Sequence, residues 1–114
     1  MSRLSTLALL PMFLAACTGA QDDDAEVRDL MAARCAACHV IPGVPAARGR
    51  VGPSLAGLAR RQYIAGRLPN SPDTLRRFLE HPQAIQPGGA MPELGLTPQQ
   101  SAAIARYLAK LDNP

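Results

Sequence analysis

The chain has 114 residues, which suffices for one small domain and excludes a large multidomain protein. It contains no Trp, and its aromatic side chains are Phe13, Tyr63, Phe78 and Tyr107, so side chains alone offer few large apolar bodies for a core. Domains this small often need a covalent or cofactor link for stability. The formal net charge is +3, and all but one of the basic residues are arginines.

The first 16 residues have the pattern of an export signal. Arg3 supplies a positive charge, and the apolar run 4–16 has the length of a signal h-region. The run ends in Leu-Ala-Ala followed by Cys17, which resembles the lipobox of bacterial lipoproteins. The resemblance implies that residues 1–16 are a lipoprotein signal peptide, and that Cys17 is acylated and anchors an exported protein to a membrane. The alternative is an ordinary signal peptide cut near Ala16, with Cys17 an incidental thiol.

A tether and a first helix follow. Residues 17–24 are small and polar, then acidic, and we interpret them as the acylated Cys with a flexible tether. Asp23, with Glu26 three residues later, resembles a capping box. The pattern predicts a helix from about Asp24 to Cys38, with a helical spacing of apolar residues. Its expected buried face consists of Val27, Leu30, Met31, Cys35 and Cys38.

The helix leads into the most specific motif of the chain. Residues 35–39 read Cys-Ala-Ala-Cys-His, the spacing for covalent attachment of a c-type haem. Cys35 and Cys38 would each form a thioether, and His39 would offer an imidazole nitrogen to the iron. A zinc site would need a further pair of ligands downstream, and a redox dithiol would need a βαβ context. We therefore expect one haem c, bound through two thioethers, and no disulfide.

Proline and glycine recur through residues 40–53, so we expect a loop that is ordered by wrapping another group. Residues 52–58 then read Gly-Pro-Ser-Leu-Ala-Gly-Leu, and Arg60 and Arg61 follow. By residue type alone, either arginine is equally consistent with a solvated surface charge.

The middle of the chain predicts a short helix. Residues 62–70 lack a regular pattern, and Ser71 before Pro72 is typical of an N-cap followed by proline at the first helical position. The helix should run from about Pro72 to Glu80, and Pro82 should stop it. His81 lies at its end, where a cation near the helix dipole is the simpler interpretation and a distal haem ligand is the alternative.

Met91 is the second residue with a candidate chemical role. It lies in the loop Pro-Gly-Gly-Ala-Met-Pro, in which two glycines permit a tight turn and the last proline keeps Met91 extended. A single Met is more often core filler. However, Met1 and Met12 belong to the expected signal peptide, and Met31 lies on the helix that leads to the haem attachment. Met91 is thus the candidate sixth ligand of the iron.

A last helix is expected from about Pro98 to Leu111. Thr97 with Gln100 forms a capping-box pattern around a proline at the first helical position. Ile104, Leu108 and Leu111 provide an apolar stripe. No segment of the sequence predicts a convincing strand.

These elements resemble the class I cytochromes c. The resemblance rests on the Cys-x-x-Cys-His motif, the Gly-Pro-x-Leu-x-Gly-Leu stretch and the Met-Pro loop, and it covers roughly residues 24–111. It implies an all-α fold of the small cytochrome c type in a domain of residues 25–114. Three main helices and the loops between them would wrap around one covalently bound haem.

The resemblance also implies roles for single residues. The carbonyl of Pro53 would accept a hydrogen bond from His39, which orients the ring and raises its basicity as a ligand. Arg61, rather than Arg60, would bond a haem propionate. Met91 would be the sixth ligand, as in the family's Met-Pro loop before the last helix.

We therefore expect an electron carrier and no enzyme. An iron held by His39 and Met91 has no open position for a small-molecule substrate, and this ligand pair raises the reduction potential. The protein would carry single electrons between respiratory-chain partners on the periplasmic side of a bacterial membrane. The alternatives are a haem c subunit of a larger oxidoreductase, or a haem enzyme or gas sensor if Met91 does not bind iron.

The charge pattern suggests how redox partners dock. Arginines cluster between residues 34 and 77, where Asp73 is the only acidic residue. Such a band would attract partners with acidic docking surfaces. The alternative is that one or two arginines neutralise propionates and the others are solvated. We expect no nucleic-acid partner.

Overall fold

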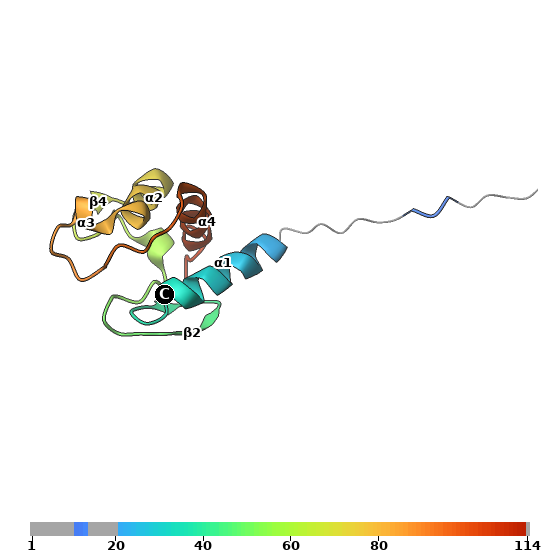
Figure 1. The fold of residues 1–114 in the computed structure, drawn as a ribbon, viewed down its shortest axis with the longest axis horizontal. Coiled ribbons are helices and arrows are strands. Elements are labelled where there is room, and N and C mark those ends of the chain that lie inside the picture. The colour runs from blue at the N-terminus through green and yellow to red at the C-terminus, as the bar shows by residue number, and fades with distance from the viewer. Residues whose placement is uncertain (1–10, 14–20, 114) are drawn as a thin grey trace, which may run out of the picture.

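The computed structural model describes residues 11–13 and 21–113, in which helices are joined by long loops and short strand pairs (Figure 1). Cys17 and most of the expected signal peptide lie outside the described residues. In chain order the elements are α1 (Gln21–Arg34), β1 (Val40–Ile41), β2 (Val44–Arg48), the 3₁₀ helix η1 (Leu58–Arg60), β3 (Tyr63–Ile64), β4 (Leu68–Pro69), α2 (Pro72–Glu80), α3 (Pro82–Ile85) and α4 (Pro98–Leu108).

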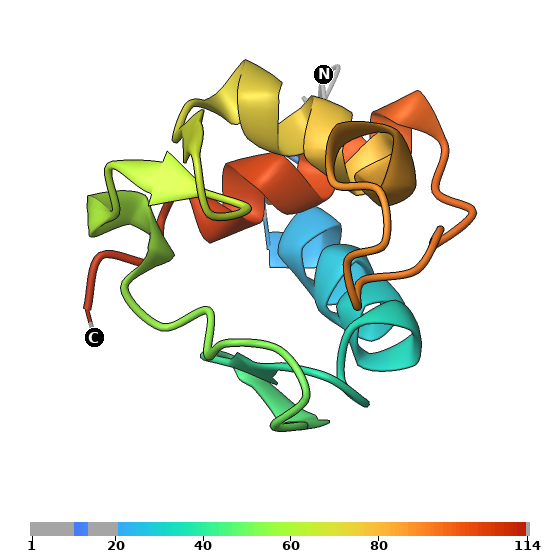
Figure 2. The same ribbon diagram turned by 90° about the vertical axis from the view of Figure 1, so that its left-hand side faces the viewer.

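The three longer helices form the framework. Figure 2 shows α4 lying between α2 and α1, and α4 packs against both. Met31 of α1 and Ile104 and Leu108 of α4 are at most 2% exposed. Full burial of such a side chain contributes about 1.5–3 kcal/mol. The expectation of a mainly helical domain with three main helices is confirmed.

The starts of α2 and α4 follow the expected capping chemistry. The hydroxyl of Ser71 accepts from the backbone N–H of Thr74 (3.1 Å), with Pro72 at the first helical position. Thr97 and Gln100 form the complete capping box: each side chain accepts from the other's backbone N–H, at 3.1 and 2.9 Å. These bonds satisfy amide groups that have no partner within the helix. Helix α4 ends at Leu108, three residues earlier than expected.

The bounds of α1 differ from the prediction at both ends. The helix begins at Gln21, so Asp23 lies inside it and is not its N-cap. It ends at Arg34, and the expected helical residues up to Cys38 form a turn instead. Hydrogen bonds from Cys35 N to Met31 O (2.8 Å) and from His39 N to Cys35 O (3.0 Å) keep this turn continuous with the helix.

The structure contains two strand pairs where the sequence predicts irregular chain. Strands β1 and β2 pair antiparallel around Gly43, whose φ of 83° suits the tight turn between Ile41 and Val44. Strands β3 and β4 form a second antiparallel pair. Tyr107 of α4 fastens the first hairpin by donating its hydroxyl to the Pro42 carbonyl (2.8 Å). Tyr107 and Pro42 are 65 residues apart in the sequence, so no local pattern could predict this hydrogen bond.

Pro82 both follows α2 and begins another helix. As expected, α2 ends at Glu80. Pro82 then occupies the first position of the four-residue helix α3, which the sequence analysis did not predict. His81 lies between the two helices, and its ring Nδ1 is 3.5 Å from a carboxylate oxygen of Glu93.

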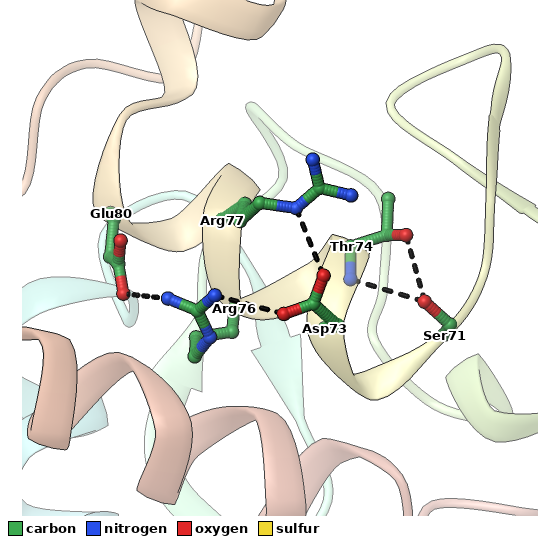
Figure 3. Close-up of polar contacts among 6 residues, drawn as sticks. All are labelled: Ser71, Asp73, Thr74, Arg76, Arg77 and Glu80. Carbon is green, nitrogen blue, oxygen red and sulfur yellow. Dashed lines mark hydrogen bonds and ion pairs between the residues drawn. The ribbon is translucent and has the colours of Figure 1, made fainter.

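The exposed side of α2 carries its own ion pairs (Figure 3). Arg76 pairs with Asp73 (2.9 Å) and with Glu80, and Arg77 pairs with Asp73 (3.1 Å). The hydrogen bond from Arg76, together with the positive charge of Arg77, holds the pKa of the Asp73 carboxyl below its ordinary value. Acidic residues of the same helix therefore already neutralise Arg76 and Arg77. The arginines that remain to attract a partner are those between residues 34 and 67.

None of the helices in the described part of the chain is long and apolar enough to span a bilayer.

Candidate functional site

One apolar cavity of about 440 Å³ gathers the predicted site residues. Its lining includes both cysteines of the motif, the histidine, the proline, the arginine and the methionine, namely Cys35, Cys38, His39, Pro53, Arg61 and Met91. Buried side chains from α1, α2 and α4 complete the walls, among them Met31, Leu75, Leu79, Ile104 and Leu108. The fold thus brings together predicted site residues that lie up to 56 positions apart, from Cys35 to Met91.

The cysteine turn lies against the loop that follows it. The backbone N–H of Gly49 donates to Ala36 O (3.1 Å), and that of Gly52 donates to Cys38 O (2.7 Å). Cys35 is buried, and burial, with a smaller contribution from the neighbouring Cys38, raises the pKa of its thiol to about 11. A reactive redox dithiol needs a lowered thiol pKa. The raised pKa of the Cys35 thiol is the opposite of that activation at this cysteine.

His39 is held in one orientation. Its Nδ1 is 2.7 Å from the carbonyl oxygen of Pro53. Because a carbonyl oxygen only accepts, Nδ1 carries the proton and Nε2 keeps its lone pair for a metal. A methyl group at Gly52 would overlap the imidazole, so this glycine allows the chain to pass directly beside the ring. The sequence analysis quoted Gly52 in a motif but did not predict this contact.

Met91 is half-buried in the cavity lining. Gly88, three residues before it, has a φ of 77°, and Pro92 follows it. The backbone carbonyl of Met91 accepts from the side chain of Gln83 in α3 (2.8 Å). Gln83 was missed by the sequence analysis because nothing local marks a glutamine as the partner of a loop.

Two arginines lie at the cavity. Arg61 donates to the carbonyl of Ser54 (2.6 Å). Arg34 stands at the start of the arginine band predicted between residues 34 and 77. It donates to the carbonyl of Leu94 (2.6 Å) and so joins the end of α1 to the segment after Met91. Asn70 holds residues 58–61, the segment that carries Arg61, by donating to the carbonyls of Leu58 and Arg61, both at 2.9 Å.

His81 is not part of this site. Its side chain is 72% exposed and is absent from the cavity lining, and its nearest charged neighbour is Glu93. The interpretation as a distal ligand therefore has no support from the geometry. Nor do the residues at positions 11–13 and 21–113 contain a cluster of three or more His, Cys, Asp or Glu side chains suited to a metal ion.

The residues present fit a covalently bound haem. The cavity walls are largely apolar, as a porphyrin requires, and its lining carries two thiols with an imidazole directly after them. The hydrogen bond that His39 donates to the Pro53 carbonyl and the space at Gly52 orient the imidazole as a ligand. Cys35 and Cys38 would hold the porphyrin, and His39 would hold the iron.

Comparisons with known proteins agree with this geometry. Residues 25–112 match the profile of the family described as Cytochrome c. The chain is 35% identical over 103 residues to a cytochrome c2 of Rhodopila globiformis, across 78% of this chain and 93% of that protein. It is also 34% identical over 82 residues to cytochrome c oxidase subunit 2 of Bacillus sp. (strain PS3), across 68% of this chain.

A second subunit 2, from Alkalihalophilus pseudofirmus, is 30% identical over 78 residues. The chain spans 23% and 22% of the lengths of these two oxidase subunits, so the similarity concerns one part of each. The family profile, in contrast, covers most of the chain, including every residue of the cavity named above. The chain therefore belongs to the cytochrome c family, with a covalently bound haem c.

Proposed function

We propose that this cytochrome c carries single electrons between respiratory-chain partners on the periplasmic side of a bacterial membrane, with His39 and Met91 as the two iron ligands. The observation that carries the proposal is the shared cavity, in which both side chains appear in the lining together with Cys35 and Cys38. The haem supplies one-electron chemistry when bound. Ligation by both residues would leave no position for a substrate, which suits transfer rather than catalysis.

The surrounding residues would keep this arrangement constant during transfer. Pro53 would hold the ring of His39 through the 2.7 Å bond, and Gly52 would leave the ring its space. Arg61 lines the cavity with a cationic group that suits a haem propionate. A site that changes little between oxidation states reorganises little, which favours rapid electron transfer.

The optical spectra of the oxidised and reduced protein test the ligand assignment. We expect a low-spin haem c in both states, an oxidised-state absorption band from a sulfur–iron bond, and weak binding of carbon monoxide and imidazole. A high-spin spectrum with ready binding of carbon monoxide would contradict Met91 ligation. It would favour the alternative of a haem enzyme or gas sensor.

The partner is proposed to dock at the mouth of the cavity through an acidic surface. Val51 and Tyr63 line the cavity and are 72% and 59% exposed, so apolar surface reaches solvent there. Arg50 precedes Val51 in the sequence, and Arg60 and Arg67 lie three residues before and four residues after Tyr63. These three arginines have no ion pair among the described residues, unlike Arg76 and Arg77 of α2, and they are available to attract an acidic partner.

The membrane anchor is proposed to be a lipid on Cys17. Support comes from the lipobox-like Leu-Ala-Ala-Cys sequence at residues 14–17. Mass spectrometry of the native protein should find a mature chain that begins at Cys17 and carries acyl groups. A chain secreted with a non-lipoprotein signal and starting at Thr18 should be recovered in the soluble periplasmic fraction. An unmodified Cys17 in the native protein would exclude the anchor.

A haem c subunit of a larger oxidoreductase is the second candidate. It is favoured by the similarity to cytochrome c oxidase subunit 2, of which this chain matches 23% of the length in one relative. Purification of the native protein from mild-detergent extracts separates the two candidates. A free carrier should elute alone, whereas a subunit should elute with a constant ratio of partner chains that survives high salt.

A further inference from the structure

Gln83 makes three hydrogen bonds to the loop that carries Met91. Its side-chain Nε2 donates to the carbonyls of Gly89 and Met91, both at 2.8 Å, and its Oε1 accepts from the N–H of Gly88 (3.1 Å). One side chain thus uses both its donor and acceptor atoms on the backbone of residues 88–91. The side chain is half-buried, which limits competition from water.

Besides Gln83, one backbone bond ties residues 88–91 to the end of α3, from Gly89 N to Gln86 O (3.0 Å). Residues 87–97 belong to no helix or strand, and Figure 2 shows this segment running from α3 towards the end of α1. Gly88 has a positive φ of 77°, and a Cβ added there would meet no atom within 4 Å, so no packing contact holds the chain on that side. The carbonyl of Met91 accepts from the side chain of Gln83, which therefore acts directly on a residue that lines the haem cavity.

A second contact joins the same residue to the other side of Met91. The backbone N–H of Gln83 donates to Oε1 of Glu93 (3.1 Å), two residues beyond the methionine. Gln83 therefore contacts the chain both before and after Met91. Further along, the bond from Arg34 to Leu94 (2.6 Å) holds the segment to α1.

We propose that Gln83 is a positioning residue for the sulfur of Met91: its side-chain amide holds residues 88–91 so that the sulfur stays in place as an iron ligand. This inference rests on the proposed ligation by Met91. Each lost hydrogen bond changes an equilibrium constant by roughly two- to tenfold. Removing all three should therefore make the sulfur considerably easier to displace.

The experiment compares three variants of the holoprotein with the wild type. Gln83→Leu keeps most of the side-chain volume and removes every hydrogen bond of the amide, and Gln83→Ala also removes the volume. Gln99→Ala is the matched control, because Gln99 is an exposed glutamine of α4 outside the cavity lining. The measurements are imidazole affinity of the oxidised haem, reduction potential, the sulfur–iron absorption band, and hydrogen exchange at the Gly88 amide.

In Gln83→Leu we expect imidazole affinity to rise by about tenfold or more. The potential should fall, because the methionine bond that raises it is weakened. The sulfur–iron band should weaken, and Gly88 exchange should accelerate, whereas Gln99→Ala should match the wild type. Wild-type values for all four measurements in Gln83→Leu would overturn the inference, as would changes confined to Gln83→Ala, which would point to packing.

A wild-type protein without the sulfur–iron band would instead refute ligation by Met91, so the two failures are distinguishable. In that case Gly88 exchange still reports whether Gln83 holds the loop, but the positioning role is lost.

Discussion

On the His39 side of the cavity the chain is held largely by backbone bonds, with side-chain bonds from His39 and Arg61 added to them, whereas on the Met91 side it is held mainly by side chains. Gly49 and Gly52 donate to carbonyls of the cysteine motif, and Leu55 N donates to Val40 O (2.9 Å). Around Met91, the corresponding contacts come from the side chains of Gln83, Glu93 and Arg34.

The difference predicts how each side responds to substitution. A backbone bond does not depend on which side chain is present, so the His39 side tolerates most changes and fails where an added Cβ has no space. A loop held by side chains can be loosened by degrees, one contact at a time. We infer that substitutions on the His39 side either leave haem attachment intact or abolish it. Substitutions on the Met91 side should weaken the bond between methionine and iron in steps.

The largest expected effect lies on the His39 side. Replacing Cys35 and Cys38 together with alanine should abolish thioether-linked haem, because these are the only cysteines among the described residues that line the cavity. Haem retention after acid–acetone extraction measures this. Cys17→Ala is the control, and its covalent haem content should equal that of the wild type. Normal covalent haem in the double variant would contradict the attachment.

Two glycine substitutions compare the sides directly. Gly52→Ala would drive a methyl group into the ring of His39, and overpacking of this kind costs about 1–3 kcal/mol or more. Gly88→Ala meets no atom and incurs only the strain of a positive φ, about 1–2 kcal/mol. Denaturant unfolding of the holoproteins should rank Gly52→Ala as the more damaging, with a disturbed haem spectrum. If the two variants lose equal free energy of unfolding and keep unchanged haem spectra, the His39 side is not the more rigid.

The same contrast explains what the sequence could predict. The starts of α2 and α4 were predicted to the residue, since Ser71 and Thr97 bond to amides three positions away. The haem motif is equally local. Such chemistry is complete within a short window of sequence.

Contacts between distant segments were not predictable in this way. The hairpin of β1 and β2 depends on Gly43 and on a hydroxyl from Tyr107, far along the chain. The turn at Cys35 replaced an expected helix end because the loop around Gly49 bonds to it. Met91 was predicted from its Gly-Pro surroundings, but Gln83 has no local signature, and its role emerges from the fold alone.

Met91→Ala removes the proposed methionine ligand completely and so gives the largest change possible on the Met91 side. Covalent haem should remain, whereas imidazole and carbon monoxide should bind readily and the potential should fall, since His/Met ligation raises it. Met31→Leu is the control, because Met31 is a buried cavity residue whose volume leucine conserves. An unchanged low-spin spectrum in Met91→Ala, with the change in His81→Ala instead, would identify His81 as the ligand.

The smallest expected effect concerns charge, in which the two sides also differ. Residues 34–67 carry several arginines, whereas Glu93 is the only charged residue between 87 and 97. An acidic partner should therefore be steered by the His39 side. Electron transfer to the physiological acceptor should slow as ionic strength rises, because exposed charges are screened beyond about 8–10 Å in physiological salt.

Charge reversal at two arginines separates local steering from net charge. Arg50 is the neighbour of Val51 at the cavity mouth, and Arg50→Glu reverses its charge. Arg106→Glu makes the same change on the exposed surface of α4, outside the cavity lining. At low salt, Arg50→Glu should reduce the association rate by about two- to tenfold without altering the spectrum. Arg106→Glu should have a smaller effect, because its charge lies farther from the docking surface. Equal slowing by both variants would mean that net charge alone guides the partner. Association rates that do not vary with salt in either variant would mean that docking is apolar, through side chains such as Val51 and Tyr63.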